Sequence, residues 1–248
     1  MNRTPKPKTP PTFHHFLKSN EYTTNTDDLI EYVQSYKWPT VSKRKTKYYN
    51  VPTAFDIETS SFYTDGEKCA IMYEWTFSFG GFVLIGRTWE QFIDMIDRLC
   101  ELLHVEQTQR LVIYVHNLSF EFQFMRKFFT WQNVFALDLH KPIRALTDRG
   151  VEFRCSYVLS GYSLASVANN LQTAEIEKLT GDLDYSLIRT PLTPMTREEL
   201  QYCINDVQIV VAYIGERITI DKGIAKIPMT KTGYVRRFCR NACFYGIE

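Results

Sequence analysis

Two carboxylates spaced two residues apart, Asp56 and Glu58, constrain this chain more than any other feature, because they follow the apolar run 51–55. On an extended strand, positions i and i+2 point to the same side, so both carboxylates should face one space while Ile57 faces the core. Charges held that close repel unless one is protonated or a hard divalent metal ion lies between them. For the pair alone, a solvated strand end is the simpler explanation. A metal site becomes the better explanation only if other segments supply further carboxylates.

The composition allows one sizeable core, and the charge is unevenly spread. The chain has 248 residues, 44% of them hydrophobic and 15% aromatic. Its net charge of +1 hides nine Lys/Arg against four Asp/Glu in residues 1–50, thirteen against twenty-one in 51–215, and seven against three in 216–248. An acidic middle between basic ends suits a metal-binding body with arms for a polyanion, although ordinary solvated faces explain it equally well.

The cysteines and the apolar runs favour a cytosolic protein. The six cysteines lack Cys-x-x-Cys spacing, so we expect reduced thiols and no zinc site. No apolar run approaches 18 residues and no secretory signal is evident, so neither export nor a membrane span is expected.

Hydrophobic periodicity predicts an alternation of strands and helices, and hence an α/β fold with a mixed sheet flanked by helices. We expect a basic, partly disordered extension at 1–47, a compact body at 48–217 and a basic segment at 218–248 that leaves the body. Predicted helices cover 27–38, 88–104, 119–130, 163–171 and 196–217; predicted strands end at 56–58 and cover 69–77, 81–86, 111–115, 134–138, 143–147 and 151–157.

A third carboxylate follows the apolar strand 111–115. Glu121 falls in the first turn of the next helix, where an acidic residue complements the helix dipole and needs no other explanation. If that strand lies beside the first strand, however, Glu121 opens onto Asp56 and Glu58. Asn117 and Phe120 could then hold a nucleotide, one by hydrogen bonding and the other by stacking.

The long helix supplies a fourth carboxylate. Tyr202 and Asp206 are spaced i, i+4 and share one face of a helix that is otherwise apolar, where unused polar groups are costly. A Tyr-to-Asp hydrogen bond on an exposed flank is the alternative. Four carboxylates suit Mg²⁺ or Mn²⁺, and two such ions roughly 4 Å apart stabilise the attacking and departing oxygens of phosphodiester hydrolysis.

The candidate residues fall in three motifs: Phe55-Asp56-Ile57-Glu58-Thr59, His116-Asn117-Leu118-Ser119-Phe120-Glu121 and Tyr202-Cys203-Ile204-Asn205-Asp206. In this order, the motifs resemble those of the 3′→5′ exonuclease (proofreading) domain of protein-primed family B DNA polymerases of phages and linear plasmids. The stretch Gly181-Asp182-Leu183-Asp184-Tyr185 resembles the lead-in to the third motif. Each motif is weak alone, and together they are specific.

The resemblance implies an RNase H-like fold, two bound Mg²⁺ or Mn²⁺ ions and hydrolysis at the 3′ end of single-stranded DNA. Asp56 would bridge the ions, Glu58 and Asp206 would complete one, Glu121 would serve the other, and Tyr202 would orient the attacking water. The implied single-strand ligands are Thr59, His116, Asn117, Phe120, Ser163, Leu164 and Tyr185.

The chain departs from the family pattern at two positions. Glu121 stands where the family has an aspartate, and Thr180 stands where it has a catalytic lysine, for which Lys178 is the nearest substitute. The longer glutamate can still reach a metal ion, but from a different geometry.

The resemblance also implies a parent protein. It would be a DNA-directed DNA polymerase used in DNA replication, with a terminal protein as partner, in the cytoplasm of a host cell. No polymerase motif occurs in these 248 residues. The alternatives are a stand-alone DNA or RNA exonuclease with the same four acids, and a nuclease-dead module that binds DNA or a protein.

Overall fold

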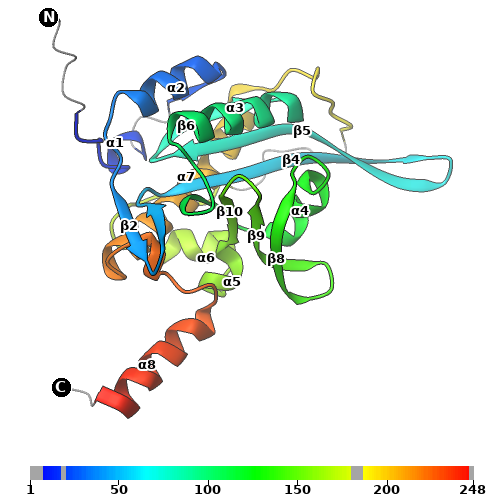
Figure 1. Ribbon diagram of the computed structural model, residues 1–248. Coiled ribbons are helices and arrows are strands. Elements are labelled where there is room, and N and C mark those ends of the chain that lie inside the picture. Colours follow the sequence, from blue (N-terminus) through cyan, green and yellow to red (C-terminus); the bar gives the residue numbers. More distant parts are fainter. Residues whose placement is uncertain (1–7, 18–20, 180–186, 246–248) are drawn as a thin grey trace, which may run out of the picture.

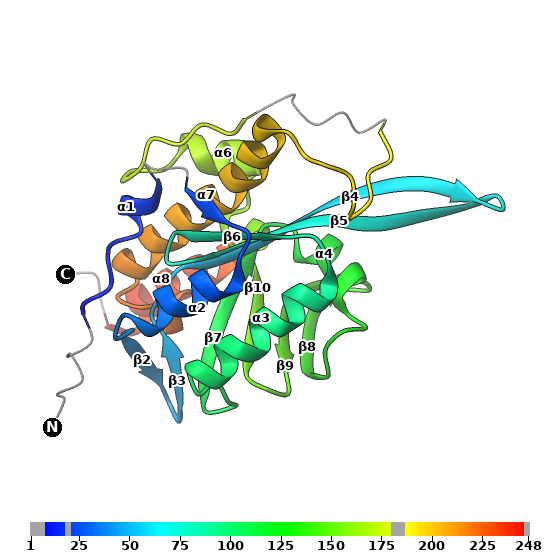
Figure 2. The same cartoon turned by 90° about the horizontal axis from the view of Figure 1, so that it is seen from above.

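A twisted mixed sheet forms the centre of the molecule (Figures 1 and 2). The computed structural model describes residues 8–17, 21–179 and 187–245. Eight strands lie in the order β1-β6-β5-β4-β7-β10-β9-β8, and a β2–β3 hairpin joins the start of β7. The strands are β1 (Tyr22–Thr23), β2 (Thr40–Lys43), β3 (Thr46–Tyr49), β4 (Thr53–Thr64), β5 (Glu67–Phe79), β6 (Phe82–Gly86), β7 (Gln109–Val115), β8 (Trp131–Asp138), β9 (Lys141–Thr147) and β10 (Val151–Cys155).

The strand that carries Asp56 and Glu58 is central, as the sequence predicts. β4 pairs antiparallel with β5 along its length and parallel with β7 at Ala54 and Tyr114. β7 also pairs parallel with β10, which makes the sheet mixed. The turn after β7 therefore lies beside Asp56, near the start of β4.

Helices cover both faces of the sheet, with α2 and α3 on one side and α6 and α7 on the other (Figure 2). On the first side, Phe92 of α3 lies 4.3 Å, ring centre to ring centre, from Phe55 of β4. On the second, Ile204 and Val207 of α7 are buried against Ala54. The helices are α1 (His14–Leu17), α2 (Thr26–Gln34), α3 (Trp89–Leu102), α4 (Leu118–Met125), α5 (Ser156–Ser160), α6 (Leu164–Asn169), α7 (Arg197–Ile220) and α8 (Lys231–Tyr245), with a 3₁₀ turn η1 (Ile224–Lys226).

Both capping boxes are confirmed. Thr88 and Gln91 close the start of α3, and Thr196 and Glu199 close the start of α7. Each pair satisfies two backbone N–H groups that the first helical turn leaves without a partner. α4, in contrast, is shorter than predicted and begins after Asn117, whose side chain makes no capping hydrogen bond.

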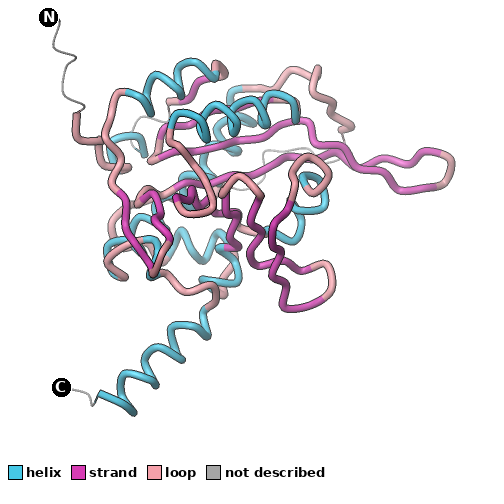
Figure 3. Tube along the Cα trace, in the orientation of Figure 1, coloured by secondary structure: helices cyan, strands magenta, loops and turns pink. Residues whose placement is uncertain are grey.

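The prediction that the first strand ends at Glu58 is wrong. β4 continues to Thr64 and forms, with β5, a long hairpin that projects from the body (Figure 3). A register shift between Glu58 and Thr59 marks the point where the hairpin leaves the body. Such an irregularity increases the local twist and redirects the strand.

The terminal segments differ from the expectation in part. β1 pairs with β6, and α2 packs against α3, so the N-terminal region from Tyr22 onward adds to the body. Ile224 and Ile227, expected to leave the body, are buried against α7, because the chain folds back through η1. α8 then extends away from the sheet (Figure 1). No helix in the described parts of the chain is both long and apolar enough to cross a membrane. The division at residues 48 and 218 stays a prediction.

Candidate active site

The β4 carboxylates lie on the face of the sheet that α7 covers. Phe55 and Ile57 pack into the core on the α3 side, so the intervening Asp56 points to the other side, as strand alternation requires. Glu58 is 8% exposed and lies directly opposite Glu74 of β5. The two strands thus bring three carboxylates to one face.

Glu121 reaches this group from the turn after β7. It lies in the first turn of α4, is 3% exposed, and lies close enough to Asp56 for that carboxylate to raise its pKa. Its Oε2 atom is buried with no hydrogen-bond partner. A residue that served only the helix dipole would be solvated at the surface.

Asp206 arrives from α7 together with Tyr202. The Nζ atom of Lys178 lies 2.5 Å from Oδ1 of Asp206 and 3.6 Å from the centre of the Tyr202 ring. The backbone of this segment is held by Asn205, which accepts a hydrogen bond from the Leu179 N–H and donates one to the Glu177 carbonyl. A single helical turn of α7 therefore fixes the acid, the phenol and the lysine.

A cavity of about 220 Å³ lies where these elements meet. It is enclosed by residues of β4, the β7–α4 turn, α6, the 171–179 segment and α7. Its lining consists of Phe55, Asp56, His116, Asn117, Glu121, Leu164, Lys178, Asp206, Val207 and Val210.

Burial raises the pKa of every carboxyl in the group, and repulsion by neighbouring carboxylates adds to the rise at Asp56, Glu58 and Glu121. The pKa values of Asp56 and Glu121 lie well above the ordinary range, because both are buried and negative neighbours oppose their ionisation. Burial, followed by Glu74 and Asp206, raises the pKa of Glu58 to about 8. Burial raises that of Asp206 to about 6, although the Lys178 ammonium opposes the rise.

The donor set fits a hard divalent cation, although its side chains are not arranged around one. Among the described residues, no group of three or more His, Cys, Asp and Glu could hold a metal ion as it stands. The unpartnered Oε2 of Glu121 and the raised pKa values of Glu121 and Asp56 nevertheless mark a buried carboxylate pair that a cation would stabilise. Oxygen-only sets of this kind suit Mg²⁺ or Mn²⁺.

Comparison with solved structures finds phi29 DNA polymerase. Its ternary complex with primer-template DNA and incoming nucleotides matches with a TM-score of 0.60 and 16% identity, over 79% of this chain and 35% of the polymerase chain. Its complex with single-stranded DNA matches with a TM-score of 0.58 and 15% identity, over 79% and 36%. The fold is RNase H-like. This confirms the predicted fold class and, at the level of fold, the resemblance to the protein-primed polymerases.

The matched region leaves most of the polymerase unaccounted for. This chain spans 35 or 36% of the length of phi29 polymerase in these comparisons. No protein-family model matches the sequence, and no curated protein matches it either. Identities of 14–16% show a shared fold, so the chemistry has to be argued from the site itself.

The predicted single-strand ligands lie at several positions around the cavity. Asn117 and Leu164 line it, and Phe120 is 41% exposed on α4 beside it. Ser163 caps α6 through the Ser166 N–H, and Thr59 lies beyond the register shift in β4 and outside the cavity lining. Tyr185 lies outside the described residues.

His116 lines the cavity as a neutral ring. Its Nδ1 atom lies 3.1 Å from Oγ of Ser156, and its Nε2 atom is buried without a hydrogen-bond partner. Burial lowers its pKa to about 4, with a contribution from the Lys178 charge. A buried nitrogen without a partner is available to a ligand group that enters the cavity.

Glu74 is a site residue that the sequence did not reveal. It is 1% exposed, faces Glu58 across the β4–β5 pair and accepts a hydrogen bond of 2.6 Å from Thr76 Oγ1. Burial raises its pKa to about 8. Only the register of the hairpin brings Glu74 to the site, so no local spacing pointed to it.

Proposed function

We propose that this chain is a metal-dependent 3′→5′ exonuclease that hydrolyses phosphodiester bonds at the 3′ end of single-stranded DNA. One observation carries the proposal: carboxylates from three segments far apart in the sequence converge on one cavity, with Lys178 and Asn117 in its wall. The shared fold with phi29 polymerase, solved with single-stranded DNA, supports the choice of substrate.

Asp56, Glu58, Glu121 and Asp206 would hold Mg²⁺ or Mn²⁺. When bound, the ions supply a nucleophilic water and neutralise charge on the transferred phosphoryl group. The ammonium of Lys178 must leave Asp206 for that carboxylate to serve as a ligand, and it would then be free to contact the scissile phosphate. Lys178 would thus take part in the reaction although the position of the family's catalytic lysine holds Thr180 in this chain.

The remaining residues bind and orient. The Asn117 side chain, which does not cap α4, can hydrogen-bond the terminal nucleotide, and the exposed ring of Phe120 can stack on its base. The Tyr202 hydroxyl would orient the attacking water. Leu164 lines the cavity and would limit the access of bulk water.

The test uses single-stranded DNA labelled at its 5′ end, so that stepwise shortening from the 3′ end is visible. Wild-type protein should release mononucleotides with Mg²⁺ or Mn²⁺ and none with a chelator. Asp56→Ala should abolish release, because loss of a ligand disrupts the whole metal site. Glu101→Gln, an exposed acid on α3, is the matched control. Release by Asp56→Ala at more than about a tenth of the wild-type rate would contradict the assignment.

The proposal extends to the parent protein. We infer that the domain proofreads for a protein-primed DNA polymerase, and that a terminal protein would reach it through that polymerase. The resemblance of three motifs and the likeness to phi29 polymerase support this. The reading frame downstream of codon 248 tests it: a continuation into a polymerase region supports it, and a stop codon there favours the stand-alone exonuclease.

A further inference from the structure

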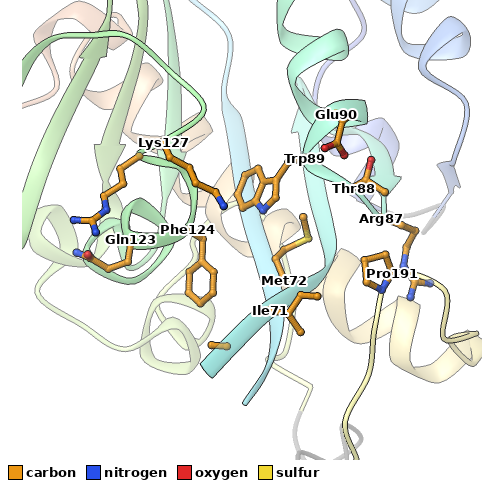
Figure 4. A pocket seen from close by; sticks show the side chains of 12 residues that line it. Ile71, Met72, Arg87, Thr88, Trp89, Glu90, Gln123, Phe124, Lys127 and Pro191 are labelled. Atoms are coloured by element: carbon orange, nitrogen blue, oxygen red, sulfur yellow. The ribbon is translucent and has the colours of Figure 1, made fainter. Parts of the chain in front are cut away.

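A second and larger cavity, of about 570 Å³, lies apart from the catalytic cavity (Figure 4). The two share no lining residue. The larger one is bounded by β5 near the projecting hairpin, the start of α3 and the end of α4. We call it the hairpin pocket, and its lining consists of Ala70, Ile71, Met72, Arg87, Thr88, Trp89, Glu90, Gln123, Phe124, Arg126, Lys127 and Pro191.

The hairpin pocket is positively charged, with three basic residues against one acid. Arg87 has a structural role, because it donates hydrogen bonds to the carbonyls of Tyr73 and Thr193 at 2.7 and 2.6 Å. Arg126 and Lys127, in contrast, are exposed, and neither forms a salt bridge with any residue in the described ranges. Two cations held without acidic partners on a concave surface suit an anionic ligand.

The same pocket offers flat apolar surface. Trp89 stacks on Phe128 with ring centres 4.9 Å apart, and Lys127 extends across the pocket toward Trp89 (Figure 4). The Lys127 ammonium lies 5.0 Å from the centre of the Phe128 ring. Aromatic rings beside cations form the pattern with which proteins bind single-stranded nucleic acid.

α4 connects the two cavities. Glu121 lines the catalytic cavity, whereas Gln123 and Phe124 line the hairpin pocket. On the same helix, the centre of the exposed Phe120 ring lies 5.2 Å from that of the Phe124 ring. The four helical steps from Phe120 to Phe124 rise about 6 Å, comparable with two nucleotides of a stacked strand at about 3.4 Å each.

We propose that the hairpin pocket binds the DNA strand a few nucleotides upstream of the terminal one, with a base against Trp89 and Phe124 and phosphates against Arg126 and Lys127. This site rests on the proposed function, and it adds a residue set that the three motifs do not contain. It gives the enzyme a second binding site for single strands that are long enough to span both cavities. Duplex DNA, with its bases stacked inward, does not fit this mode.

The test compares oligothymidylates of two and ten nucleotides with the double variant Arg126→Glu/Lys127→Glu. For the ten-nucleotide strand, KM should rise about tenfold or more with kcat unchanged, and the salt dependence of binding should weaken by about 1.4 in log–log slope. For the two-nucleotide strand, which cannot span both cavities, the kinetic constants should not change. Lys37→Glu/Lys45→Glu is the matched control, because both lysines are exposed and neither lines the pocket.

Binding alone separates this proposal from the nuclease assignment. The Asp56→Ala protein in chelator, with or without the two charge reversals, is titrated with the fluorescent ten-nucleotide strand. If the charge reversals raise Kd but the wild-type protein hydrolyses no DNA, the binding role of the hairpin pocket stands and the exonuclease assignment is rejected. Hydrolysis by the wild type with an unchanged Kd would reject the pocket. An equal rise in KM for the two-nucleotide and ten-nucleotide strands would also overturn the proposed role of the hairpin pocket. Binding of a blunt duplex as tight as that of the single strand would do the same.

Discussion

Lys178 forms an ion pair with Asp206, at 2.5 Å between Nζ and Oδ1, inside the proposed catalytic cavity. The ammonium also lies over the Tyr202 ring, so one cation contacts both members of the third motif. The Lys178 ammonium thereby neutralises part of the negative charge of the carboxylate cluster. Under the proposed function, Lys178 would have to withdraw from Asp206 when a divalent cation binds there.

Lys178→Gln should lower kcat about 10–100-fold at saturating Mg²⁺. The substitution removes the cavity-lining ammonium, which can stabilise charge that develops on the phosphate, but keeps a polar side chain only one atom shorter. Single-turnover kinetics on a single strand measure the effect, with Lys45→Gln as the surface control. A kcat within about twofold of wild type would reduce Lys178 to a counter-ion of the metal-free protein.

Tyr202→Phe should slow hydrolysis by roughly 10–1000-fold, as the loss of one positioning hydrogen bond does. The ring is kept, so the contact with Lys178 and the melting temperature should persist. A lower kcat with an unchanged melting temperature would indicate that the Tyr202 hydroxyl acts in the reaction and not in packing. Unchanged kinetics would mean that the Tyr202 ring only packs.

The local spacing of the carboxylates made much of the site predictable. Asp56 and Glu58 are brought together by the two-residue period of a strand, and Tyr202 and Asp206 by one helical turn. Glu121 needed one long-range assumption, that the strand before it lies beside the first strand, and the β4–β7 pairing confirms it. Each of these predictions needed at most one contact between distant segments.

The features that the sequence did not predict depend on strand register or on irregular stretches of chain. Glu74 lies at the site because of its pairing with Glu58 across a long hairpin. The contact of Lys178 with Asp206 arises in an extended segment without any periodic pattern. The burial of Ile224 likewise follows from a reversal of the chain that apolar periodicity did not reveal.

Glu121→Gln should lower activity by orders of magnitude and leave the melting temperature of the metal-free protein unchanged or higher. The side chain is buried with an orphaned oxygen, and Asp56 opposes its ionisation, so a neutral amide removes repulsion. Glu121→Asp keeps the charge but moves the ligand by about one bond, roughly 1.5 Å. Since Mg²⁺ demands near-ideal geometry, Mn²⁺ should rescue Glu121→Asp better than Mg²⁺ does. Equal activity of both variants and wild type across a Mg²⁺ titration would show that Glu121 is not a ligand.

The metal-free protein should lose stability as the pH rises from 6.5 to 8. Glu58 and Glu74 have pKa values of about 8 in the folded protein, against an ordinary value of 4.5, so the folded state retains protons that the unfolded state has released. Unfolding then becomes easier with rising pH. His116, with a folded pKa of about 4 against 6.5, has the opposite effect, but only below pH 6.5.

Thermal melts in chelator at pH 6.5 and pH 8 measure this loss, at on the order of 2–4 °C per kcal/mol for a chain of this size. Glu74→Gln should reduce the difference, because it removes one of the raised carboxyls and lowers the repulsion on Glu58, while all four proposed ligands stay in place. Adding Mn²⁺ at pH 8 should restore the melting temperature, since an ion that binds only the folded state stabilises it. A wild-type melting temperature that stays level or rises from pH 6.5 to 8 in chelator would show that these carboxyls are already neutralised by other means.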